Sequence, residues 1–190
     1  MGIVLASGSP RRRELMEMLG VRDLRIIPAR GEEKYAPGLP PEEIVRVLSR
    51  AKAEEVAAAC APEDVVVAAD TVVWVDDRVF GKPKDRAEAV AMLHTLSGRG
   101  HEVFTGVTVL RGGECRSETE RTEVFFRPLT DREIEAYVDS GEPMDKAGAY
   151  GAQGLASLFV RGIRGDFFNV MGLPICRLGE MLKQQGVELI

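Results

Sequence analysis

Residues 65–85 read VVVAADTVVWVDDRVFGKPKD, and the rest of the chain is best understood outward from them. The stretch begins with the β-branched and small apolar run Val65 to Ala69, which is typical of a strand buried on both faces. The run ends on Asp70, where the apolar pattern would continue with another valine. The sequence therefore predicts a buried strand that ends on a carboxylate.

A hairpin is predicted directly after this strand. Residues 71–75 are again rich in β-branched residues, and the turn signal Asp-Asp and a short apolar pair follow them. The return strand leads to Lys82, and we expect the hairpin to bring this lysine towards Asp70. A buried carboxylate is tolerated beside a cation or a metal ion. The alternative is that Asp70 caps a strand end and Lys82 is a solvated turn residue.

Length and charge narrow the class of protein. The chain has 190 residues, of which 45% are hydrophobic and 29% charged, so we expect one globular domain over residues 1–190. The net charge of −5 argues against broad binding of nucleic acid, which needs a basic surface. It leaves room for a small phosphorylated ligand, because local Lys and Arg side chains can oppose the overall sign.

The cysteines and the apolar runs bear on the location of the protein. Its three cysteines lie far apart and form no CxxC motif, so neither a zinc site nor a disulfide framework is predicted. We therefore expect a reducing, cytoplasmic location. The N-terminal residues show no cleavable signal pattern, and no apolar run approaches the ~20 residues of a membrane span. No membrane partner is expected.

The N-terminal residues carry a second candidate feature. Residues 3–6 are typical of a short strand, Ser9-Pro10 of a helix start, and Arg11 to Arg13 then fall in the first helical turn. Cations are unfavourable there, because the helix dipole is positive at this end. A strand, a small-residue loop and an arginine-bearing helix start together favour a phosphate site, although the P-loop pattern is absent. The alternative is a solvated basic helix start.

A long helix is predicted from Pro41 to Cys60. Lys52 falls on its apolar stripe, where a lysine either extends to solvent or reaches a buried anion. The preceding loop holds Glu32 and Glu33, acids that face solvent in most loops and gain a role only where a metal ion is needed. The apolar residues of the stripe are Val45, Leu48 and Val56.

Periodicity and turn residues predict the other elements. The N-terminal helix should bury Leu15, Met18 and Leu19. We expect further strands at residues 25–27, 101–110, 117–126 and 155–163, and further helices at 86–97, after a capping box at Thr130, and at 174–185. This order of elements predicts an α/β protein with a mixed sheet.

Residues 144–154 fit neither a helix nor a strand, because they are rich in glycine and poor in β-branched residues. Small residues allow backbone to approach a ligand closely. Gln153 offers both a donor and an acceptor, which suits the edge of a nucleobase. The alternative is a plain connecting loop.

Five motifs, in order along the chain, resemble those of the Maf family of nucleoside triphosphate pyrophosphatases. They are LASGSPRR at residues 5–12, AADT at 68–71, GKP at 81–83, DKAGAYGAQG at 145–154 and VMGLP at 170–174. Five ordered motifs are far more specific than any one of them, and the resemblance covers nearly the whole chain.

The resemblance implies a fold and an activity. It implies an elongated mixed central β-sheet flanked by helices, with two lobes and a cleft, similar to the ITP pyrophosphatases. It implies cleavage of a nucleoside triphosphate between its α and β phosphorus atoms, with a divalent metal cation, Mg²⁺ or Mn²⁺. Dimers are common in this family, so a homodimer is a further expectation.

The substrate class follows from the same resemblance. The segment DKAGAY followed by Gln153 resembles the subgroup that cleaves dTTP and UTP, with modified pyrimidine nucleotides as further candidates. A glutamine can pair with the O4/N3–H edge of uracil or thymine, because it donates and accepts at once. In the family, substrate preference is tied to positions that match Arg11, Thr71 and Gln153.

The resemblance also implies roles for single residues. Asp70 is the candidate general base for the water that attacks the α-phosphorus. Glu33, with Glu32 as a further candidate, would join Asp70 around the divalent cation. The candidate phosphate-binding residues are Ser7, Arg11, Arg12, Lys52 and Lys82.

Two other classes of function compete with this hypothesis. One is a nucleotide-binding regulator of cell division or septum formation with little catalysis, which the intact acid and lysines disfavour. The other is an RNA- or tRNA-modifying protein, which the acidic net charge and the lack of an aromatic stacking platform disfavour.

Overall fold

The computed structural model describes residues 2–21 and 23–189, which divide into two compact units. The first unit contains the chain up to Asp70, Thr105–Glu120 and the residues from Gly172 onward. The second contains Thr71–Phe104 and Arg121–Met171. The expectation of one domain over residues 1–190 stays a prediction.

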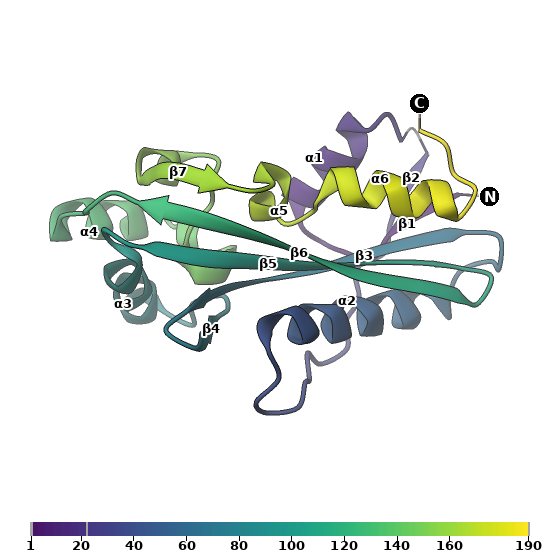
Figure 1. Ribbon diagram of the computed structural model, residues 1–190, viewed down its shortest axis with the longest axis horizontal. Helices are drawn as coiled ribbons and strands as arrows, with labels where there is room; N and C mark the ends of the chain where they lie inside the picture. The colour runs from purple at the N-terminus through teal and green to yellow at the C-terminus, as the bar shows by residue number, and fades with distance from the viewer. Residues whose placement is uncertain (1, 22, 190) are drawn as a thin grey trace. The chain divides into compact units, whose positions relative to one another are not determined.

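A mixed β-sheet is the central element, as predicted (Figure 1). Among the described residues its order is β2 (Leu24–Ile26), β1 (Ile3–Leu5), β3 (Val65–Val75), β5 (Gly100–Arg111), β6 (Glu114–Phe126) and β7 (Val160–Arg164), with β4 (Arg78–Phe80) also paired to β3. β1 pairs in parallel with β2 and β3, whereas β4 and β7 pair antiparallel with their neighbours. This arrangement confirms the α/β class with a mixed sheet.

Six α-helices are described in the same residue ranges. They are α1 (Pro10–Met18), α2 (Pro41–Ala57), α3 (Arg86–Leu96), α4 (Asp131–Asp139), α5 (Phe167–Met171) and α6 (Ile175–Gln184), and three 3₁₀ turns, η1 (Glu142–Asp145), η2 (Ala147–Ala149) and η3 (Leu155–Leu158), follow α4. The predicted capping box at the start of α4 is present, since Thr130 and Glu133 bond each other's backbone N–H groups. None of the described helices is both long and apolar enough to cross a membrane.

In the first unit, α2 covers one face of the strands, and α1 and α6 lie on the opposite face (Figure 1). Alternate residues of β1 and β3 point towards α2 and pack against Ala53 and Val56. A Cβ at Gly106 of β5 would lie 2.2 Å from the carbonyl oxygen of Val45, so this glycine lets α2 approach the sheet closely. The strand residues in this core are Val4, Val66 and Ala68, and Ala6, directly after β1, joins them.

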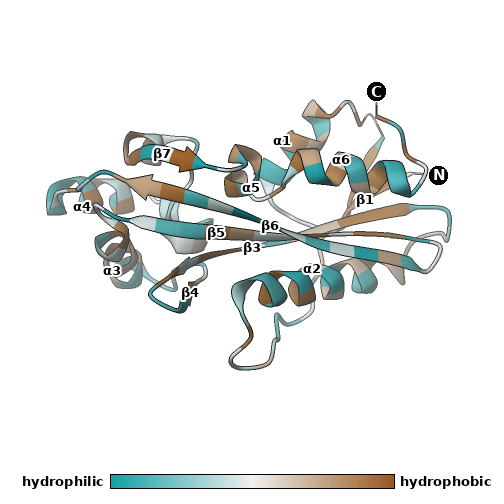
Figure 2. Ribbon diagram, in the orientation of Figure 1, coloured by the Kyte–Doolittle hydropathy of each residue, from teal (hydrophilic) through white to brown (hydrophobic). Residues whose placement is uncertain are grey.

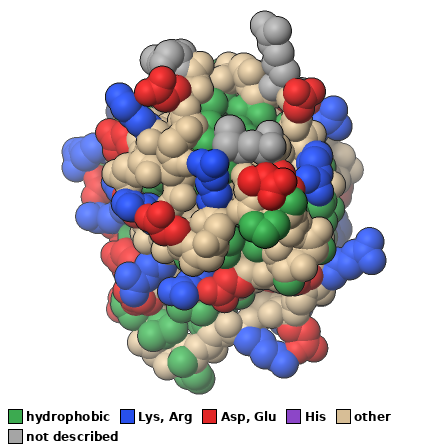
Figure 3. Space-filling model, turned by 90° about the vertical axis from the view of Figure 1, so that its right-hand side faces the viewer, with side chains coloured by type: hydrophobic (Ala, Val, Ile, Leu, Met, Phe, Trp, Pro, Cys, Tyr) green, Lys and Arg blue, Asp and Glu red, His purple; other side chains and the backbone are tan. Residues whose placement is uncertain are grey.

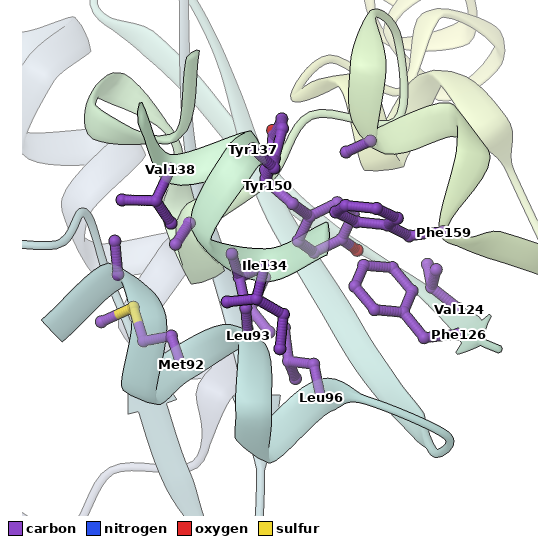
Figure 4. Packing of buried hydrophobic residues seen from close by; sticks show 14 of the residues in the cluster. Met92, Leu93, Leu96, Val124, Phe126, Ile134, Tyr137, Val138, Tyr150 and Phe159 are labelled. Atoms are coloured by element: carbon purple, nitrogen blue, oxygen red, sulfur yellow. The ribbon is translucent and has the colours of Figure 1, made fainter. Parts of the chain in front are cut away.

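The second unit has its own core, in which residues of α3 and α4 pack with residues of β3, β5 and β6 (Figure 4). Leu93 and Leu96 of α3 pack with Ile134 of α4, and four aromatic rings complete the cluster. The rings meet edge to face, with centroids 4.8–6.1 Å apart, which is a favoured arrangement. They belong to Phe126, Tyr137, Tyr150 and Phe159.

The structure corrects three details of the predicted elements. β3 does not end at Asp70 but runs on to Val75, mainly hydrophobic along its length (Figure 2). Met16 is buried in α1, whereas Met18 is 57% exposed. The last strand begins only at Val160, because the residues before it form η3. The hairpin after β3 is confirmed, and its turn residues Asp76 and Asp77 both have the positive φ of a type I′ turn.

Candidate functional site

The first unit places an ammonium group between two carboxylates. Asp70 lies on the same face of β3 as Val66 and Ala68, because side chains alternate along a strand, and this face meets α2. Lys52 lies on the matching face of α2 and forms ion pairs with Asp70 and with Glu33, whose Oε1 is 2.6 Å from its Nζ. The predicted lysine on an apolar stripe therefore reaches a buried anion.

Asp70 is the most buried of the three charged groups, with 6% of its surface exposed. Burial raises the pKa of the Asp70 carboxyl above its usual range, and the nearby cations Lys52 and Arg12 act in the opposite direction. A carboxylate with a raised pKa is a better proton acceptor than an ordinary one. The geometry therefore suits the base role predicted for Asp70, although that role stays a prediction.

Arg12 turns inward from the first turn of α1. Its Nε donates to the carbonyl oxygen of Gly172 at 2.7 Å, and its Nη1 donates to Ser7 Oγ at 3.2 Å. Ser7 follows β1 and is itself buried, and its Oγ also accepts from the N–H of Ser9. Burial lowers the pKa of Arg12, and the negative charge of Asp70 opposes that shift, so the guanidinium lies near enough to the acid for their charges to interact. The arginine remains cationic.

The remaining charged residues of α1 and of the loop before α2 differ in their exposure and in their ion-pair partners. Arg13 pairs with Glu17 on the exposed side of α1, at 2.7 Å. Arg11 is half-buried in the same turn. Glu32 pairs with Lys34 in the exposed loop, whereas Glu33 pairs with Lys52, the same ammonium that contacts Asp70. Which of the two acids joins Asp70 around a cation stays a prediction.

Three predicted residues, Thr71, Lys82 and Gln153, belong to the second unit. Thr71 is half-buried on β3, and the side chains of Lys82 and Gln153 are exposed. The segments that carry the two exposed residues are joined, because Gly148 N–H donates to the Gly81 carbonyl oxygen at 3.0 Å. The convergence of Lys82 with Asp70 stays a prediction.

The pair Glu33 and Asp70 offers a limited set of ligands for a cation. Within the described residues, no group of three or more His, Cys, Asp or Glu side chains is arranged to hold a metal ion. Two carboxylates that contact one ammonium from either side nevertheless make a place where positive charge is stabilised. Mg²⁺ is commonly held in this way, by one or two carboxylates together with water and substrate phosphates. The residues present fit such an ion.

A family model described as Maf-like protein matches residues 2–185. This chain belongs to the Maf family.

Curated relatives of this Maf chain extend over almost its full length. A dTTP/UTP pyrophosphatase of Carboxydothermus hydrogenoformans is 53% identical over 188 residues, which cover 98% of this chain and 100% of that protein. A dTTP/UTP pyrophosphatase of Bacillus anthracis is 48% identical over 187 residues, which cover 98% of this chain and 97% of that protein.

Solved structures similar to this Maf chain are more distant in sequence. The Ham1 protein of Staphylococcus aureus aligns with a TM-score of 0.53 at 15% identity, covering 97% of this chain and 100% of that one. A HAM1 protein of Coxiella burnetii aligns with a TM-score of 0.50 at 17% identity, covering 97% and 99%. At these identities the similarity concerns the fold alone, and it supports the predicted α/β class.

Sequence reasoning missed two contacts that shape this Maf site. The first is the Gly172 carbonyl that holds Arg12; the motif VMGLP contained this glycine, but no role was assigned to it. The second is Glu55 on α2, which accepts the backbone N–H groups of Arg30 and Gly31 at 2.8 and 3.0 Å and so fixes the loop before Glu33. No local pattern in the sequence marks Glu55, because its partners lie 24 and 25 residues away.

Proposed function

We propose that this protein is a nucleoside triphosphate pyrophosphatase that hydrolyses dTTP and UTP to the monophosphate and pyrophosphate. Two near-full-length relatives with 48–53% identity carry that name, and the chain belongs to the Maf family. The observation that carries the proposal is the cluster of Lys52, Glu33 and Asp70, with the charge of Arg12 near enough to interact with its two acids, all within the first unit. A triphosphate needs such cations, and an attacking water needs such a base.

Each residue of the cluster has a distinct part in the reaction. Asp70 accepts a proton from the water that attacks the α-phosphorus, and its raised pKa makes it a competent acceptor. Arg12 and Lys52 bind phosphate oxygens, and charge-assisted hydrogen bonds of this kind are about twice as strong as neutral ones. Ser7 orients Arg12 through its hydroxyl group. Arg11 and Lys82 are further phosphate-binding candidates.

A divalent cation, Mg²⁺ or Mn²⁺, completes the proposed chemistry. Glu33 and Asp70 would hold it, since these carboxylates already contact a common positive group, Lys52. When bound, the cation supplies positive charge for the departing pyrophosphate.

Base selection is assigned to the second unit. Gln153 lies exposed in the loop between Gly151 and Leu155, where its amide can donate to O4 and accept from N3–H of uracil or thymine. Thr71 is a further specificity residue on β3. Modified pyrimidine nucleotides share this edge and are additional candidate substrates.

We place the protein in the cytoplasm, without nucleic-acid or membrane partners, and we propose a homodimer. Its three cysteines are free thiols, which suits a reducing compartment.

On the face seen in Figure 3, Lys and Arg side chains alternate with Asp and Glu rather than forming a basic patch. A nucleic-acid surface would need such a patch.

A kinetic screen tests the proposal. Pyrophosphate release is measured from a panel of nucleoside triphosphates with Mg²⁺ and with Mn²⁺, and we expect the largest kcat/KM for UTP and dTTP. If these nucleotides bind but are not hydrolysed with either metal, the protein is a nucleotide-binding regulator and the proposed enzymatic function is wrong. Equal turnover of all nucleotides would remove the assignment of substrate.

A further inference from the structure

One carboxylate–phenol pair holds the loop that carries Gln153. Tyr137, on α4, donates its hydroxyl proton to Glu142 Oε1 at 3.1 Å. The same phenol oxygen accepts the backbone N–H of Gly151 at 3.3 Å, and Glu142 Oε2 accepts the backbone N–H of Leu155 at 3.2 Å. The chain is therefore fixed two residues before Gln153 and two residues after it.

The glycine beside Gln153 shows how tightly the carboxylate approaches the loop. Gly154 has a φ of +80°, and a Cβ at this position would lie 2.9 Å from both carboxylate oxygens of Glu142. A side chain here would meet both backbone strain and a steric clash. Glycine is thus needed for the backbone to pass over the Glu142 carboxylate.

A lysine supports the other side of the same loop. Lys146 is nearly buried, and its Nζ donates to the Glu142 carbonyl oxygen at 2.5 Å and to Asp145 Oδ1 at 2.8 Å. Its aliphatic part fills the space beside Gly151, where a Cβ would lie 2.7 Å from Lys146 Cε. The predicted motif DKAGAYGAQG therefore includes residues that shape the loop.

We infer that Tyr137 and Glu142 are positioning residues for Gln153, and that they set the preference of the enzyme for uracil and thymine over other bases. The inference rests on the proposed role of Gln153. An exposed glutamine in a glycine-rich loop has many conformations, and the loss of that freedom on binding would weaken discrimination. The two anchors, at Gly151 and Leu155, restrict the loop backbone on both sides of Gln153 before the nucleotide binds.

Tyr137→Phe is the principal test. The change removes one hydroxyl group and keeps the ring that packs edge to face on Phe159. UTP and CTP differ at the edge that Gln153 is proposed to contact, so the ratio of their kcat/KM values measures base discrimination. We expect this ratio to fall about tenfold, mainly through a higher KM for UTP, because the loop loses the anchor at Gly151.

A matched control separates loop positioning from loss of stability. Tyr150→Phe removes a buried hydroxyl from the same core, and within the described part of the chain that hydroxyl bonds His101 Nε2 at 2.7 Å rather than a loop N–H. We expect this variant to lower the melting temperature to a similar degree while the UTP/CTP ratio stays unchanged. An equal loss of discrimination in both variants would overturn the inference.

A double-mutant cycle with Gln153→Ala shows whether the effect passes through Gln153. If it does, Tyr137→Phe has little further effect on the UTP/CTP ratio in the Gln153→Ala background. A full additive effect there would contradict positioning. If Gln153→Ala alone leaves the ratio unchanged, the proposed base reading fails and the inference fails with it; if only Tyr137→Phe leaves it unchanged, the inference fails alone.

Glu142→Gln gives an independent second variant. The glutamine keeps one acceptor oxygen, so one of the two bonds to Glu142 survives, and we expect about a threefold fall in the UTP/CTP ratio. Glu142→Ala removes both bonds and should approach the effect of Tyr137→Phe. No change in either variant, with the protein folded by circular dichroism, would exclude Glu142 from the role.

Discussion

In each unit a glutamate carboxylate holds one loop by accepting backbone N–H: two such groups for Glu55 and one, next to Gly154, for Glu142. The surroundings of the two glutamates differ. Glu55 of the first unit is exposed and holds Arg30 and Gly31, two residues before Glu33. Glu142 of the second unit is half-buried and is bonded to Tyr137, which belongs to the core.

The difference follows from the side chain that each loop carries, Glu33 in the first unit and Gln153 in the second. Glu33 is proposed to bind a cation, and a charged group attracts its partner over several ångströms without strict orientation. Gln153 is proposed to donate and accept hydrogen bonds, which weaken steeply as their angle departs from linear. A loop that presents an amide therefore needs the more rigid support, and the second unit provides it from its core.

The largest effect should come from Asp70→Asn, which tests the division of labour between the units. We expect kcat for UTP to fall by about 100-fold or more, because the variant lacks the proton acceptor, while the UTP/CTP ratio stays the same. Steady-state pyrophosphate release with both nucleotides gives both quantities. Near-normal turnover would remove Asp70 from the role of base.

Gln153→Glu should change the UTP/CTP ratio more than kcat, the reverse of the result expected for Asp70→Asn. An ionised glutamate only accepts hydrogen bonds, so it cannot donate to O4 of uracil. We expect the UTP/CTP ratio to fall by about tenfold or more, with a smaller change in the largest kcat of the panel. An unchanged substrate profile would refute base reading by Gln153 and would leave the second unit without a role in selection.

The sequence predicted the two elements that carry Lys52 and Asp70, α2 and β3, because each has a clear apolar pattern. β3 was marked by a continuous apolar run and α2 by an apolar helical stripe that includes Lys52. The stripe left two alternatives for Lys52, solvent or a buried anion, and the structure shows the second, with Asp70 as the anion. The strand boundary at Asp70 was wrong, because a carboxylate paired with a lysine is tolerated inside a strand that sequence alone would end there.

Contacts between distant segments could not be predicted in the same way. Glu142 was not singled out, since its role depends on a phenol five residues earlier and on an N–H thirteen residues later. Gly106 also carried no signal, because only the close approach of α2 to β5 makes a side chain impossible there. Such positions depend on tertiary packing rather than on local propensity.

A pair of glycine substitutions compares the two loop supports directly. Gly154→Ala meets strain at φ +80° and the half-buried carboxylate of Glu142, so we expect about a fivefold loss in the UTP/CTP ratio and a lower melting temperature. Gly31→Ala brings a Cβ 2.8 Å from Glu55 Oε2, but this atom ends a flexible, exposed side chain that can move away. We expect a change of less than about twofold in kcat. If Gly31→Ala impaired kcat by as large a factor as Gly154→Ala lowers the UTP/CTP ratio, the burial of Glu142 would not distinguish it from Glu55 as a support of its loop.

The smallest effect is expected for Glu55→Gln, and it depends on pH. Hydrogen bonds from the backbone N–H groups of Arg30 and Gly31 lower the pKa of the Glu55 carboxyl below its usual value. A carboxyl with a lowered folded-state pKa stabilises the protein above its unfolded pKa of about 4.3, and this stabilisation is lost as the pH falls through the folded value.

The melting temperatures of the parent protein and of Glu55→Gln should therefore differ slightly at pH 7 and converge as the pH falls below about 4. Glu54→Gln is the matched control, because Glu54 is also exposed on α2 but pairs with Arg50 instead of with the loop. The control Glu54→Gln should leave the dependence of activity on Mn²⁺ concentration unchanged. Glu55→Gln should raise the Mn²⁺ concentration needed for half-maximal activity by about twofold, because the loop that carries Glu33 is held less firmly. A difference in melting temperature that grows towards acid pH would show that the carboxylate of Glu55 does not stabilise this loop.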